Sequence, residues 1–238
     1  MKKQLIDNEF GEITVHFQRN FKNLTIRLSA SSVIRISAPA SASKKQVLLF
    51  FESRRDWIRK NMDNIKSITS NRTLFTPETN FCTKKHVLHL RKETISEMQF
   101  RIANDKIHVI IPDATEWENE GTQKYIRKAI TEALRIEAQQ YLPRRLFELA
   151  TKFGFEVKGL KIKNLKSRWG SCTSALSLNL NLNLMQLPNH LIDHVILHEL
   201  CHTRFMNHGA GFHKLLQEVD PQAKSNEKEI RKYNPNLY

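Results

Sequence analysis

The residues best suited to chemistry in this sequence are two histidines and a glutamate in the segment His198-Glu199-Leu200-Cys201-His202. Residues four positions apart lie on one face of a helix, so the two imidazoles can reach a single metal ion. Zinc accepts imidazole nitrogen, and a catalytic zinc site has three protein ligands and an open position for water. Glu199 can accept the proton of a water molecule whose pKa the metal lowers. The segment therefore predicts a zinc site that activates water.

The stretch around this motif supports the prediction. Apolar residues dominate positions 191–200, and a buried helix does not carry two histidines and a glutamate without a function that satisfies them. His190 and His194 extend the four-residue spacing toward the N-terminus. Each of them is followed directly by an aliphatic residue, whereas His198 is followed by Glu199. We therefore interpret these two histidines as residues of the helix face or neighbours of the ligands.

The third ligand must come from beyond the helix. Asn207 and Gly209 flank His208 and suit a turn that returns its ring to the ion. Glu218 and His213 are the alternatives. Glu218 would complete a site of two histidines and one carboxylate, and His213 equally fits one face of a final helix. Ligand chemistry and spacing favour His208.

The spacing of the three histidines equals that of the metzincins, but two features of that class are missing. Phe205 stands where metzincins have glycine, and no methionine follows Met206. A methionine turn below the metal is therefore impossible.

The segments before the motif indicate how it is positioned. Leucines alternate strictly with polar residues from Leu176 to Leu184, which predicts a half-buried strand of nine residues with an asparagine-rich face. Leu187 and Pro188 end this strand. Asn189 can then begin the helix that carries the motif.

The first half of the chain is rich in strand patterns. Alternation over residues 24–28 and 34–37 predicts two strands, with Pro39 ending the second. Ser43 can cap a helix whose apolar stripe extends to Ile65. A strand-rich region with one helix follows from these patterns.

The middle of the chain predicts a hairpin, a boundary and a long helix. Residues 98–111 alternate around a two-residue turn at 104–105. The acidic, polar segment 113–121 is the candidate boundary between two lobes. An amphipathic helix follows over 123–141, and Pro143 should kink or restart it.

Composition and charge limit the possible classes. A chain of 238 residues with 40% hydrophobic content can form one large domain or two small lobes. The net charge of +14 would attract phosphate-bearing partners or acidic substrates. Basic clusters such as 54–60 and 84–92 are more often a solvated face than a nucleic-acid groove. A nucleic acid or nucleotide partner is therefore the minor alternative.

Targeting and cysteine patterns give further expectations. Polar residues follow Lys2 and Lys3, and no segment approaches the roughly 20 apolar residues of a membrane span, so we expect a cytoplasmic protein without a membrane partner. Cys82, Cys172 and Cys201 form no C-x-x-C pair, and we interpret them as buried thiols. The sequence carries no signal for an oligomeric state.

With these motifs, the sequence resembles the YgjP-like metal-dependent hydrolases, relatives of the WLM and SprT-like zincins. The matching parts are Ser-Arg-Trp-Gly-Ser-Cys at 167–172, the leucine/asparagine strand ending at Pro188, the motif at 198–202, and Asn207-His208 followed by Phe212. The likeness extends weakly into the first half, through residues 35–39 and 57–58.

The resemblance implies a zincin-like catalytic lobe with His198, His202 and His208 as zinc ligands and Glu199 as general base. It also implies an edge strand above the metal that lines an extended substrate, for which the strand from 176 to 184 is the candidate. Arg168 is a further catalytic candidate that would stabilise a developing oxyanion, or else it holds its loop in place.

These observations together predict an α+β fold. We expect a strand-rich N-terminal lobe with one helix over residues 1–118, and a zincin-like catalytic lobe with a mixed sheet and the HExxH helix over residues 119–238. The expected function is zinc-dependent hydrolysis of a peptide or protein, of the metallopeptidase type. Hydrolysis of a nucleotide phosphoanhydride and a nucleic-acid-associated protease are the alternatives.

Overall fold

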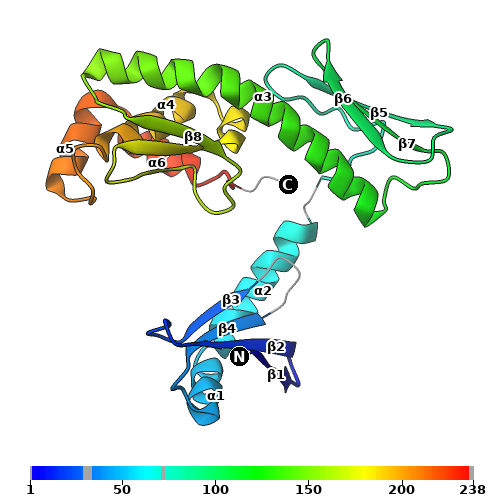
Figure 1. The fold of residues 1–238 in the computed structure, drawn as a ribbon, viewed down its shortest axis with the longest axis vertical. Coiled ribbons are helices and arrows are strands. Elements are labelled where there is room, and N and C mark those ends of the chain that lie inside the picture. Colours follow the sequence, from blue (N-terminus) through cyan, green and yellow to red (C-terminus); the bar gives the residue numbers. More distant parts are fainter. Residues whose placement is uncertain (1, 29–33, 71–72, 236–238) are drawn as a thin grey trace. The chain divides into compact units, whose positions relative to one another are not determined.

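The computed structural model describes residues 2–28, 34–70 and 73–235 of the chain (Figure 1). They form two compact units, Met1–Thr73 and Leu74–Tyr238, and each unit is described by itself. This division differs from the boundary expected near residue 118. The reason is that the hairpin of residues 98–111 shares a hydrophobic core with the second half of the chain.

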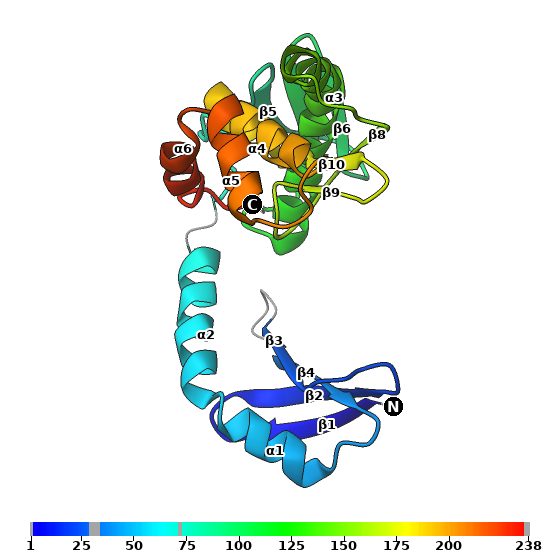
Figure 2. The ribbon, with the colours of Figure 1, turned by 90° about the vertical axis from the view of Figure 1, so that its left-hand side faces the viewer.

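The first unit is a four-stranded sheet with two helices. Its strands follow the order β1-β2-β4-β3, in which β2 and β4 are parallel and the other pairs antiparallel. α1 lies against one face of the sheet (Figure 2), and Val47 and Phe51 of this helix share one buried core with Val15 and Ile36 of the strands. The elements are β1 (Lys2–Asp7), β2 (Gly11–Gln18), β3 (Thr25–Leu28), β4 (Ile34–Pro39), α1 (Lys44–Glu52) and α2 (Arg55–Ser70).

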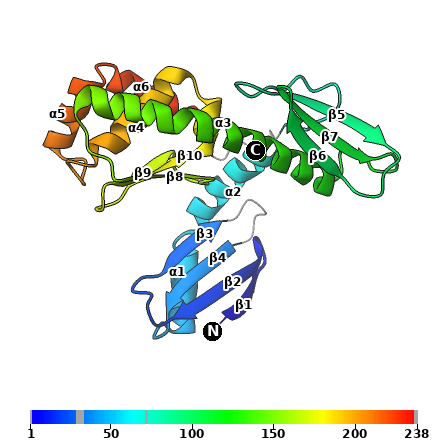
Figure 3. The ribbon, with the colours of Figure 1, turned by 45° about the horizontal axis from the view of Figure 1, so that its top comes forward.

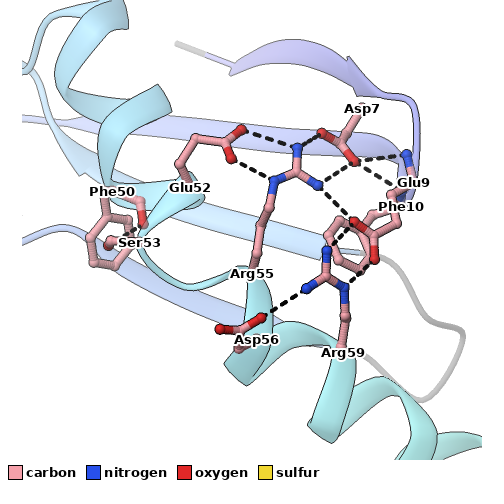
Figure 4. Close-up of polar contacts among 9 residues, drawn as sticks. All are labelled: Asp7, Glu9, Phe10, Phe50, Glu52, Ser53, Arg55, Asp56 and Arg59. Atoms are coloured by element: carbon pink, nitrogen blue, oxygen red, sulfur yellow. Dashed lines mark hydrogen bonds and ion pairs between the residues drawn. The ribbon is translucent and has the colours of Figure 1, made fainter.

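The predicted cap at Ser43 is confirmed. Its hydroxyl accepts a hydrogen bond from the Gln46 amide, and the Gln46 side chain accepts one from the Ser43 amide. The helix is nevertheless interrupted, because α1 ends at Glu52 and α2 begins at Arg55. Arg55 donates to Glu52 at 2.5 Å and to Asp7 at 2.5 Å, which ties both helices to the end of β1 (Figure 4).

The second unit contains two mixed three-stranded sheets, β5-β7-β6 and β8-β10-β9, joined by the long helix α3 (Figure 3). Ile107 and Val109 of one sheet, Ile126 and Ile130 of α3, and Leu178 of the other sheet belong to one core. The elements are β5 (Val87–Glu93), β6 (Gln99–Ala103), β7 (Lys106–Pro112), α3 (Glu120–Phe153), β8 (Gly159–Lys163), β9 (Gly170–Cys172), β10 (Ser177–Asn181), η1 (Leu182–Gln186), α4 (Asn189–Cys201), α5 (Ala210–Val219) and α6 (Ala223–Ile230).

Two local predictions in this unit have different outcomes. The hairpin turn is confirmed, because Asn104 and Asp105 have φ of 50° and 56°, as a tight two-residue turn requires. α3 neither ends near residue 141 nor restarts at Pro143. It continues to Phe153, and Gly154 ends it with φ of 67°. The buried face of this helix outweighs the one backbone hydrogen bond that proline removes.

The leucine/asparagine strand is shorter than expected and lies in a different place. β10 covers only residues 177–181, after which the chain turns into η1, capped by the Asn181 side chain on the Asn183 amide. β10 pairs with β8 on one side and β9 on the other. It therefore cannot be the edge strand that lines a substrate, and β9 is the free edge nearest α4.

The three cysteines are free, but they are not all buried. Cys201 is buried, Cys172 is half-buried and Cys82 is exposed, so the expectation of buried thiols is wrong for Cys82. Among the described helices, none is long and apolar enough to cross a membrane.

Candidate metal centre

α4 and the turn that follows it position the three histidines of the sequence motif. The apolar face of α4, which includes Leu191, Ile192 and Leu200, is fully buried in the core of the second unit. The burial of α4 in this core fixes the position of His198 near its C-terminal end, and His202 ends the helix as its C-cap. His208 lies in the connection to α5, directly before the helix begins.

The three rings converge. One nitrogen of each imidazole lies within 4.8 Å of one nitrogen of the other two. The Nε2 atoms of His198 and His208 are 3.1 Å apart, and the ring centroids of His202 and His208 are separated by 4.7 Å. Three imidazole nitrogens gathered in this way can bind one divalent cation, and imidazole is a preferred ligand of zinc.

Hydrogen bonding and burial keep these rings in the form that binds metal. His202 Nδ1 lies 3.0 Å from the carbonyl of Phe205, which can only accept, so Nδ1 carries the hydrogen and Nε2 is left free. Burial, together with the neighbouring histidines, lowers the pKa of His198 to about 3. Burial also lowers the pKa of His202. Both rings are therefore neutral at pH 7, as a metal ligand must be.

Phe212 of α5 supports the cluster. Its fully buried ring lies 5.0, 4.6 and 4.7 Å, centroid to centroid, from the rings of His198, His202 and His208. From the sequence, Phe212 is part of the pattern that carries the family resemblance, where it follows Asn207-His208. Helical spacing does not link Phe212 to His208, because His208 lies before α5 begins.

Glu199 lies beside the histidines on α4 and is only 6% exposed. Among the described residues, its Oε2 atom is buried without a hydrogen-bond partner. Burial raises the pKa of Glu199 to about 7, although the positive charge of Arg168 offsets part of this effect. A carboxyl group in this state can accept and return a proton near neutral pH.

The close approach of β9 shapes this part of the site. A Cβ atom at Gly170 would lie 2.7 Å from Oε1 of Glu199, so only glycine leaves room for the glutamate. The preceding residues of the motif, Arg168 and Trp169, line the same cavity as Glu199 and His198. The structure thus brings Arg168 to the site that the sequence assigned to it.

The other histidines and acids have different surroundings. His194 Nδ1 lies 2.6 Å from Oδ2 of buried Asp220, and His190 lies 3.0 Å from exposed Glu229. His213 and Glu218 are exposed on α5 and are not members of the histidine cluster found among the described residues. The cluster therefore consists of the three histidines that the sequence favoured.

A cavity of about 410 Å³ opens beside Glu199 and His198. Its far wall is α6 and the residue after it, with Glu227, Ile230 and Arg231. The sequence missed this wall, because residues 223–230 are mostly polar and show no apolar stripe. Only the folded chain returns α6 to α4.

Three histidines gathered beside a buried carboxylate and an open cavity define a candidate centre for metal-assisted hydrolysis. The family model of the YgjP-like metallopeptidase domain matches residues 22–233. The chain belongs to this family and is a metal-dependent peptidase. No curated relative matches the chain.

Two solved structures share a limited likeness with part of the chain. The metallopeptidase zymogen of Pyrococcus abyssi abylysin is 20% identical, with a TM-score of 0.35 over 38% of this chain and 91% of that chain. The metallopeptidase zymogen of Methanocaldococcus jannaschii jannalysin is 24% identical, with a TM-score of 0.35 over 38% of this chain and 93% of that chain.

Proposed function

We propose that the protein is a zinc peptidase in which His198, His202 and His208 hold the metal and Glu199 is the general base. The observation that carries this proposal is the buried Oε2 atom of Glu199, which has no hydrogen-bond partner among the described residues. Glu199 lines the same cavity as His198, one of the three clustered histidines. A buried polar atom without a partner is costly, and a reacting water molecule would satisfy it.

Zinc bound by the three imidazoles would polarise the scissile carbonyl and lower the pKa of water. Glu199 accepts a proton from the attacking water at Oε2 and then delivers it to the leaving amine. Its pKa of about 7, raised by burial, suits both steps near neutral pH. Arg168 is the candidate for stabilising negative charge that develops on the substrate oxygen.

The substrate of this proposal is an extended peptide. β9 is an edge strand, and no other described strand pairs with its outer side, which could therefore pair with a substrate peptide. Gly170 at its start packs directly on Glu199. A peptide added along β9 would therefore run past the general base and the metal ligands.

The test compares the wild-type protein with Glu199→Gln, using casein, a peptide library and nucleoside triphosphates as substrates. We expect peptide cleavage that falls by at least about 10²-fold in the variant, because a general base contributes about 10²–10⁴-fold. Elemental analysis should find the same zinc content in both proteins. Glu218→Gln, at an exposed position on α5, is the matched control and should retain activity.

Two outcomes would overturn the proposal. Full turnover in Glu199→Gln would end the assignment of the general base. Hydrolysis of nucleoside triphosphates without any peptide cleavage would favour the phosphoanhydride alternative, which the basic net charge of +14 suggested.

A further inference from the structure

Two arginines face the cavity beside the candidate metal centre. Arg168 comes from the loop before β9, and Arg231 comes from the C-cap of α6. Both residues are exposed, and among the described residues neither guanidinium has an ion pair or a hydrogen bond with another side chain. By contrast, Arg145 on α3 is held by both Asp193 and Glu148. The two cavity arginines therefore keep their hydrogen-bonding capacity for a ligand.

Among the residues that the structure describes, the acids of the cavity form no ion pair with these cations. Glu227 on α6 lines the cavity but forms no ion pair with either arginine among the described residues. The other acid is Glu199, which is nearly buried. Within the described part of the chain, the cavity wall therefore carries two guanidinium groups without an ion pair, while its two carboxylates belong to half-buried Glu227 and buried Glu199.

The rest of the lining suits an aliphatic stem. Trp169 and Ile230 are partly buried, and they contribute apolar surface to the same cavity. A guanidinium binds a carboxylate through two parallel hydrogen bonds, which gives both affinity and geometric selectivity. A ligand with a short apolar stem that ends in a carboxylate would match this combination of groups.

We infer that this cavity is a specificity pocket for a substrate carboxylate next to the scissile bond, with Arg231 as its determinant and Arg168 as the second cation. The inference rests on the proposed function and names its substrate class, acidic peptides. The carboxylate comes either from an aspartate or glutamate side chain or from the C-terminus of the peptide. Both sources present the same chemistry to the arginines.

The experiment uses the full-length zinc protein and peptides that differ in one group. In the first set, peptides with glutamate at a position flanking the cleaved bond are compared with peptides that have glutamine there, one flanking position at a time. In the second set, a peptide with a free C-terminus is compared with the same peptide amidated at its C-terminus. We expect the preferred carboxylate peptide to be cleaved at least about 10-fold more efficiently than its neutral partner, mainly through a lower KM. The pair that shows the difference identifies the source of the carboxylate.

Variants of α6 test the role of Arg231. Arg231→Gln should abolish the preference, and Arg231→Glu should shift it toward peptides with lysine at the same position, because charge complementarity is reversed. Lys228→Gln is the matched control, since Lys228 lies on the same helix but does not line the cavity. Arg168 is left unchanged because it is a catalytic candidate.

A binding measurement separates this inference from the proposed function. Calorimetric titration of the Glu199→Gln protein with the same peptides reports recognition without turnover. Equal dissociation constants for acidic and neutral peptides, or an acid preference that Arg231→Gln leaves intact, would overturn the inference. Selective binding without cleavage of any peptide by the wild-type protein would instead contradict the proposed function and support the pocket.

Discussion

Gly170 of β9 and Glu199 of α4 are packed so closely that a Cβ atom at position 170 would lie 2.7 Å from Cγ and Oε1 of the glutamate. Glu199 is nearly buried, so its side chain has little room to move away. The strand that borders the site and the proposed general base are therefore matched in shape.

Replacement of Gly170 by alanine should displace the carboxylate of Glu199. We expect kcat to fall by about 10²-fold, because a misplacement of about 1 Å in a catalytic group costs this much. The overpacked site should also lose about 1–3 kcal/mol of unfolding free energy. Steady-state kinetics and urea unfolding measure the two effects.

Ser171→Ala in the same strand is the control for Gly170→Ala. It removes only a hydroxyl that accepts a hydrogen bond from Asn179. Its kcat should remain within a few-fold of wild type. If Gly170→Ala has the same kcat as this control, the close packing of β9 on Glu199 has no catalytic consequence.

Loss of His208 should release the metal. His208→Ala should weaken zinc affinity by more than about 100-fold, since even a residue that only orients a ligand contributes about 10–100-fold. Competition with a chelating dye measures the dissociation constant. His213→Ala is the control, because its exposed ring lies 6.4 Å from that of His208 and outside the cluster. Equal zinc affinity in both variants would remove His208 from the ligand set.

The buried hydrogen bond between His194 and Asp220 should contribute to stability. Asp220 also accepts from the Gln222 amide and the Asn226 side chain, so its carboxylate satisfies three donors. Asp220→Ala leaves them without an acceptor and should cost about 2–5 kcal/mol of unfolding free energy.

The exposed pair of His190 and Glu229 provides the comparison for Asp220→Ala. His190→Ala should change the unfolding free energy by only about 0–1 kcal/mol, because solvent screens an exposed pair. Chemical denaturation of both variants measures the difference. A loss below 1 kcal/mol in Asp220→Ala would contradict the prediction.

Acid should destabilise the first unit through its ion-pair network. The hydrogen bond from Arg59 lowers the pKa of Glu9, and Arg55 likewise lowers the pKa of Glu52. Burial opposes the shift of Asp7, but hydrogen bonds from Arg55 and two backbone amides leave its pKa lowered as well. Because the folded-state pKa values lie below the unfolded ones, the stabilisation is complete above the ordinary values of 3.8 and 4.5 and is lost as the pH falls below them.

Hydrogen exchange of amides in β1 and β2, followed from pH 6 down to about pH 3, measures this effect in the full chain. Arg55→Gln should reduce stability at pH 6 and make it less dependent on pH. An unchanged pH dependence in this variant would show that the network does not contribute.

Several features were predictable because they depend on residues close together in the sequence. The spacing of His198 and His202 on a helix, the cap at Ser43 and the turn at Asn104 and Asp105 all follow from local backbone geometry. The extent of α3 was not predictable in this way. Its continuation through Pro143 depends on buried contacts with strands elsewhere in the chain.

By itself, the sequence determined which side chains could bind a metal and activate water, because ligand type and helical spacing are local properties. Only the tertiary structure decided the surroundings of that chemistry. Strand pairing made β9 the edge instead of β10, and the packing of α6 brought Arg231 to the cavity. These outcomes depend on contacts between residues far apart in the chain, and the periodicity of one segment does not reveal which other segment it contacts.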